Sequence, residues 1–145
     1  MWFKQGYLGL AGNNLTYPAV GVTAGGKGVI AFTLLGADHY PSAAYAILDA
    51  IAGAGDIHIV AEGLGPEDGF TAYKAFSAQT GRGRFFITRW GDYGATAVDG
   101  NSVWIGSEYI GQTCSFAEWF ATLGSCGGTR IGAVNWYTRI SKITP

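Results

Sequence analysis

Glycine interrupts this chain too often for long helices to form. It occupies 24 of the 145 positions, roughly 17% against an average usage of about 7%. Each glycine costs a helix interior roughly 1 kcal/mol relative to alanine, which argues against a helical bundle. The glycines follow no three-residue period and only 4 prolines are present, which excludes collagen. With 48% hydrophobic residues and a net charge of −1, the composition is not that of a disordered chain. An all-β globular fold remains.

Short apolar runs recur between glycine-rich or aspartate–glycine turns, which is the pattern of antiparallel β-hairpins. The stretch 62–91 carries few strand signals. The expected turns are Gly25–Lys27, Gly53–Gly55 and Asp99–Ser102. The expected strands are Gly6–Ala11, Ala19–Ala24, Gly28–Leu35, Ser42–Leu48, Asp56–Ala61, Arg84–Thr88, Gly94–Val98 and Val103–Glu108, followed by a last strand or pair of strands within 131–143.

The two cysteines, Cys114 and Cys126, predict a local disulfide rather than a metal site, which would need two more ligands. Two buried free thiols are the alternative. Between them, Ser115 and Glu118 match the capping box that begins a helix, and Gly124 follows where a C-terminal cap would lie. We therefore expect a short helical loop closed by a disulfide, worth about 3 kcal/mol in the chain-entropy model. Such a bond indicates an oxidising compartment.

An internal repeat relates the two halves of the chain. Tyr17–Val22, a glycine turn and Val29–Phe32 parallel Tyr93–Val98, a turn and Val103–Gly106. Each unit would hold two hairpins, that is, four antiparallel strands. Four-stranded units in tandem are typical of β-propeller blades.

Four motifs carry a resemblance to a known family: Asn13–Ala19, Asp38–Ala43, Glu62–Gly69 and especially Arg89–Tyr93. With them the chain resembles the C-terminal blades of secreted bacterial β-propellers, often described as sialidase-like or BNR-repeat-like. The resemblance implies an incomplete propeller of about two antiparallel four-stranded blades, with one disulfide-clamped helical loop. Residues 1–15 would then be a strand of a preceding blade, 16–69 a blade, 70–92 a loop and 93–145 the final blade.

The Asp box of sialidases is only partly kept. Asp99 and Trp104 have its spacing, but Gly100 comes one place early and Ala97 replaces the serine. Neither the arginine triad nor the tyrosine–glutamate nucleophile pair can be transferred. We therefore expect a structural or ligand-recognition segment of a secreted protein, with no catalytic activity of its own. The alternative is part of a carbohydrate-active hydrolase whose site is completed by further blades.

The candidate site residues form two groups. One lies just before a strand expected to line the centre of the ring, and the other lies in an acidic loop. Their structural alternatives are a tryptophan wedged between blades, an aspartate that caps a turn and a solvated loop. No catalytic residue is assigned, and no cofactor is expected, with calcium as the one alternative. The tentative ligand-binding residues are Arg89, Trp90, Asp92 and Tyr93, and the tentative calcium ligands are Asp92, Glu67 and Asp68.

The net charge and the first residues of the chain limit which partners and which location can be expected. Nine basic residues against 10 acidic ones give no overall attraction to nucleic acid or anionic membrane, although 82–90 interleaves arginines with aromatics. The expected partners are the remaining blades or another copy of the chain, and carbohydrate as a ligand. The first residues carry no signal peptide, so a secreted, extracellular location implies that the signal lies outside this sequence.

Overall fold

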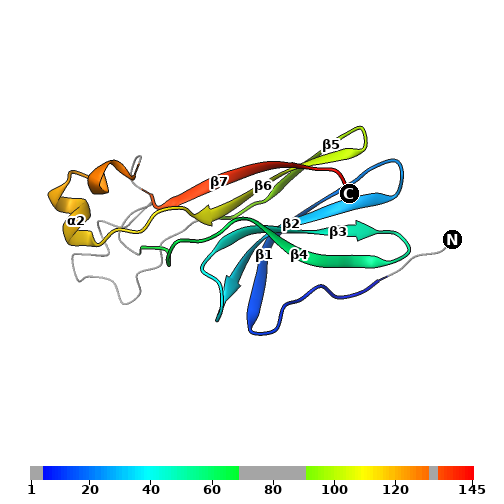
Figure 1. The fold of residues 1–145 in the computed structure, drawn as a ribbon, viewed down its shortest axis with the longest axis horizontal. Helices are drawn as coiled ribbons and strands as arrows, with labels where there is room; N and C mark the ends of the chain where they lie inside the picture. Colours follow the sequence, from blue (N-terminus) through cyan, green and yellow to red (C-terminus); the bar gives the residue numbers. More distant parts are fainter. Residues whose placement is uncertain (1–4, 69–90, 131–133) are drawn as a thin grey trace.

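The computed structural model describes residues 5–68, 91–130 and 134–145. They form two antiparallel sheets, a short helix and a 3-10 turn (Figure 1). The first sheet has the strand order β1-β2-β3-β4 and the second the order β5-β6-β7. The strands are β1 Asn13–Val22, β2 Lys27–Gly36, β3 Ser42–Asp49, β4 Gly53–Ala61, β5 Ala95–Asp99, β6 Ser102–Ile110 and β7 Trp136–Ile143, and the helical elements are α2 Phe116–Ala121 and η1 Cys126–Gly128.

Two of the predicted hairpin turns are confirmed. Asp99 pairs with Ser102 across a two-residue turn, and Gly100 there has a φ of 59°. In the β1–β2 hairpin, Gly26 has a φ of 81°. Both turns require the left-handed backbone conformation, which glycine adopts without steric cost.

The remaining predicted turn, Gly53–Gly55, was placed too late in the chain. It lies between β3 and β4, where the Asp49 carboxylate accepts hydrogen bonds from the backbone N–H groups of Ile51 (2.7 Å) and Ala52 (2.9 Å). An aspartate side chain can close a turn in this way without glycine. Gly53 is consequently the first residue of β4 rather than part of the turn.

The first predicted strand, Gly6–Ala11, is wrong for this structure. These residues form no strand, and Leu8 packs instead on the first sheet. We call residues 5–11 the N-terminal arm. The run Arg84–Thr88 lies outside the described residues, and the last expected strand is the single strand β7.

One hydrophobic core joins the two sheets. Val29 and Ala31 of β2 pack with Val103 and Ile105 of β6, all of them at most 2% exposed. Gly21 of β1 admits this contact, because a Cβ there would lie 2.7 Å from Val103 Cγ1. The sheets stack with β1 against β5, β2 and β3 against β6, and β4 against β7. Two pairs of strands that are equivalent in the sequence repeat, β1 with β5 and β2 with β6, therefore lie over one another, whereas β7 lies against β4.

The opposite side of the first sheet is also apolar, and we call it the outer face. Phe32, at its centre, is 1% exposed, whereas Val20 and Val22 on β1 are about half exposed, at 52% and 53%. The N-terminal arm crosses this face at Leu8 and leaves a groove on each side, with volumes of about 500 and 460 Å³. From the strand register, the residues of the outer face are Leu15, Val20, Val22, Gly28, Ile30, Phe32, Leu34, Ala44, Ala46, Leu48, Ala54, Ile57 and Ile59.

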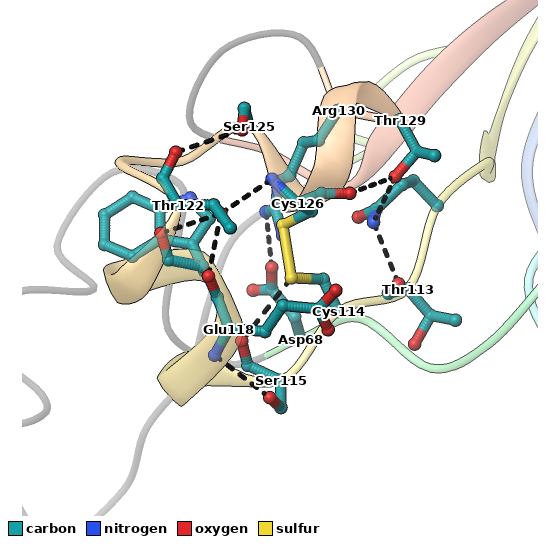
Figure 2. The surroundings of a disulfide bond; sticks show 12 residues. Asp68, Thr113, Cys114, Ser115, Glu118, Thr122, Ser125, Cys126, Thr129 and Arg130 are labelled. Carbon is teal, nitrogen blue, oxygen red and sulfur yellow. Dashed lines mark hydrogen bonds and ion pairs between the residues drawn. A yellow bond between two sulfur atoms is a disulfide. The ribbon is translucent and has the colours of Figure 1, made fainter.

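The predicted disulfide between Cys114 and Cys126 is present and closes the helical loop (Figure 2). The predicted helix is present as well, since the Ser115 hydroxyl accepts from the N–H of Glu118 at 3.2 Å. After the helix, Gly124 has a φ of 87°. Local signals were sufficient here because a cap and a short cross-link involve only near neighbours in sequence.

A buried ion pair lies beside the disulfide (Figure 2). Arg130 Nη2 donates to Asp68 Oδ2 at 2.5 Å, and the two side chains are 0% and 4% exposed. Arg130 Nε also donates to the carbonyl of Val134, and Asn135 Nδ2 donates to the carbonyl of Pro66. These contacts fix the disulfide loop to the segment that follows β4.

The coarse fold prediction is confirmed: the described chain is mostly β, in two antiparallel sheets, with one disulfide and a very short helix. The finer assignment to propeller blades stays a prediction, since the second sheet has three described strands rather than four.

Candidate functional site at the junction of the two sheets

The end of β6 brings polar groups to the line where the two sheets meet. Thr33 of β2 donates to the carbonyl of Glu108 at 2.9 Å across the sheet interface. Next to Glu108, Gly91 is buried. A Cβ on Gly91 would lie 2.8 Å from the ring of Tyr17 and 3.2 Å from Glu108 Oε2. Tyr17 itself has a φ of 54°, a conformation that costs free energy for residues other than glycine.

The surroundings of Glu108 raise the pKa of its carboxyl. Burial raises the pKa of its carboxyl above the usual value, and the negative charge of Asp92 adds to the rise, while the backbone N–H of Gly91 acts in the opposite direction. The Oε2 atom is buried, with no hydrogen-bond partner in the described part of the chain. A carboxyl whose pKa is raised by burial, beside an exposed carboxylate, is an arrangement found in acid–base chemistry.

The sequence-predicted ligand residues fall in different settings. Asp92 is exposed and lies within electrostatic range of Glu108. Tyr93 is 85% exposed. Arg89 and Trp90 lie outside the described residues, so their part in ligand binding stays a prediction.

The predicted calcium ligands are not brought together as a metal centre in the described residues. Asp68 is held by the guanidinium of Arg130, and the described ranges contain no group of three or more His, Cys, Asp or Glu side chains that could hold a metal ion. Glu67 Oε1 is buried. A calcium ion at Asp68 would have to compete with a buried ion pair, which does not favour binding there.

Glu108 was missed by the sequence analysis, although the predicted hairpin contained the signal. Ala95 pairs with Gly106, and extending this antiparallel register by two residues places Tyr93 opposite Glu108. The candidate segment 89–93 and Glu108 were therefore already neighbours in the expected hairpin.

We expect Glu108→Gln to stabilise the protein at neutral pH. Because the folded-state pKa of Glu108 lies above its unfolded value, the folded state holds the proton more tightly, and stability falls as pH rises from about 4.5 through the folded pKa. Glutamine does not ionise and avoids this loss. In thermal melts, the variant and the wild type should agree at pH 4, and the variant should melt higher at pH 7.

Asp99→Asn is the matched control, with the opposite sign. Hydrogen bonds from Lys142 (2.7 Å) and Trp104 (3.1 Å) lower the pKa of Asp99, so its contribution is present at neutral pH and is lost as pH falls through the folded pKa. The asparagine variant should melt slightly lower than the wild type at pH 7, since the ion pair with Lys142 is exposed. A Glu108→Gln variant that melts lower at pH 7 would contradict the assignment of a partly buried, destabilised carboxylate.

Comparisons of the chain with protein-family models, with curated proteins and with solved structures found no match. The resemblance to bacterial β-propellers thus rests on the quoted motifs alone. In the described residues, no helix has the length and apolar character needed to cross a membrane.

Proposed function

We propose that this chain is a structural and ligand-recognition segment of a secreted, propeller-like β-protein and works by stacking with further sheets of the same kind. One observation carries the proposal: the first sheet is apolar on both faces. Its inner face packs on the second sheet, and among the described residues only the arm crosses its outer face. Sheets apolar on both sides belong in architectures that cover both sides.

The packing of Tyr17 supports a repeated arrangement. Tyr17 lies against Gly91, which is two residues before the repeat-equivalent Tyr93. Tyr93 is itself 85% exposed. If each unit packs this tyrosine against the unit that follows it, Tyr93 would contact the sheet after the second one.

The disulfide supports a secreted location, because such bonds persist in oxidising compartments. The recognition role would fall on the junction around Glu108, Asp92 and Tyr93, since polar side chains gather there at the ends of strands. Carbohydrate, the ligand class implied by the resemblance, offers hydroxyl groups to both carboxylates.

The outer face can be tested by its affinity for an apolar dye. In dilute solution the wild type should bind 8-anilinonaphthalene sulfonate, and Val20→Lys with Ile59→Lys should reduce its fluorescence. These side chains are 52% and 38% exposed, so the unfolding midpoint should change little. Val98→Lys, at an equally exposed position of the second sheet (49%), should leave dye binding unchanged. A wild type that binds no dye would overturn the proposal.

A second candidate, a carbohydrate-active hydrolase, is favoured by one observation: the raised pKa of Glu108 beside Asp92. Glycosidases pair a protonated acid with an ionised carboxylate. Chromogenic glycosides would test it, with Glu108→Gln expected to remove activity and Asp92→Asn to reduce it. The exposed Glu118→Gln is the control. Activity indifferent to both site substitutions would exclude this pair as the catalysts.

A further inference from the structure

The second sheet has one strand fewer than its repeat partner. β1, β2 and β3 of the first sheet correspond to β5, β6 and β7, whereas nothing in the described residues corresponds to β4. The 8-residue strand β7 pairs with β6 on one side, and its other edge has no described neighbour. Unpaired edges of this length readily accept another strand.

The N-terminal arm, conversely, is a segment of strand-like sequence without a sheet in the described structure. Within the described ranges, its backbone is bonded to the rest of the chain only at Asn13, whose N–H donates to the carbonyl of Leu10 at 3.1 Å and whose side-chain Nδ2 donates to the carbonyl of Ala11 at 3.0 Å. Leu8 is its only residue packed on the core cluster of the outer face, and Tyr7 is fully exposed.

The position of the arm in the chain matches the missing strand. β4 is the last strand of its unit and is followed along the chain by β5, the first strand of the next. The arm likewise comes directly before β1, the first strand of its unit. It therefore occupies, in sequence, the place of a fourth strand that belongs to a preceding sheet. Its length of about 20 Å when extended suits an edge such as β7.

We propose that the arm of one copy of this chain pairs with β7 of a second copy and completes the second copy's sheet as its fourth strand. This inference rests on the proposed function, since it names the partner for the stacking surfaces. It is a head-to-tail contact, because the arm of each copy meets β7 of another, and such contacts close into rings when the rotation permits. Strand donation of this kind supplies main-chain hydrogen bonds between molecules.

The same contact would cover the outer face. A copy that receives the arm in its second sheet stacks that sheet on the donor's first sheet, where Leu8 now lies. A four-stranded sheet of 9-residue strands offers a face of roughly 570 Å². Together with the strand edges, this approaches the roughly 800 Å² per partner of a stable interface.

The experiment is photo-crosslinking from the arm in the full chain. Tyr7 is replaced by benzoylphenylalanine, and equal amounts of ¹⁴N- and ¹⁵N-labelled protein are mixed before irradiation. We expect a mixed-isotope product that joins position 7 of one copy to residues 136–143 of another. A monomer at every concentration in sedimentation, or cross-links only within one copy, would overturn the proposal.

Gly6→Pro and Tyr7→Pro form a matched pair that tests strand pairing directly. Both positions are exposed, so neither substitution should affect the fold of the monomer. Successive N–H groups of a strand point to opposite edges, and proline removes one of them. One variant should therefore weaken assembly roughly tenfold or more, and the other should assemble like the wild type. Equal behaviour of the two would refute the pairing. Dye binding to the outer face with no cross-link to β7 would leave the proposed function standing and remove only this inference.

Discussion

Arg130→Met is expected to lower the free energy of unfolding by about 3–5 kcal/mol, because it leaves the carboxylate of Asp68 in a buried position without its guanidinium. The two side chains are 0% and 4% exposed, so water cannot replace the lost partner. The loss should appear in urea denaturation, followed by tryptophan fluorescence, as a lower midpoint with an unchanged slope.

Two controls separate the buried charge from general disruption. Arg130→Met combined with Asp68→Leu should recover much of the loss, since replacing both members of a buried pair by apolar residues is often close to neutral. Lys142→Met removes an ion pair to Asp99 whose side chains are 45% and 55% exposed and should change stability little. A small loss in Arg130→Met alone would show that this junction does not hold the disulfide loop in place.

Phe32→Ala should be of similar size, about 3–5 kcal/mol, because a large aromatic side chain is removed from a packed site. Phe32 is 1% exposed and packs with Leu34, Ala44 and Ala46 on the outer face. The expected readout is again a lower urea midpoint.

Val20→Ala is the comparison on the same face. Its side chain is 52% exposed, so its truncation should cost far less than that of Phe32. The contrast measures how far the arm and the neighbouring strands cover the centre of the face and leave its β1 edge open. Equal losses at the two positions would mean that the whole face is covered in solution.

Local sequence signals predicted local structure well. Asp99–Ser102 forms a hairpin turn, Ser115 caps a helix and Cys114 bonds to Cys126. Each of these depends on residues a few positions apart, where backbone conformation and short-range hydrogen bonds decide the outcome. The same reasoning failed for Gly6–Ala11, because a strand also requires a neighbouring edge to pair with, and the pattern of one segment does not reveal whether an edge is present.

In the candidate site, too, some residues were found from the sequence and others only from the structure. Asp92 and Tyr93 were found from a motif, whereas Glu108 became notable only when β6 carried it to a partly buried place at the end of the sheets. The buried pair of Arg130 with Asp68 joins residues 62 positions apart. Asp68 stood in a predicted acidic loop, but no pattern marked Arg130 as its partner, so their contact could not be read from spacing.

The sequence by itself determined the β class, most turns, the helix cap and the disulfide, since these follow from glycine conformations, side-chain capping and short loop closure. Only the tertiary structure decided that β1 lies over β5 and β2 over β6, that the first sheet has an apolar outer face crossed by the arm, and that one edge of β7 has no neighbour among the described residues. Those features depend on contacts between distant segments, where packing and burial rather than local preference fix the arrangement.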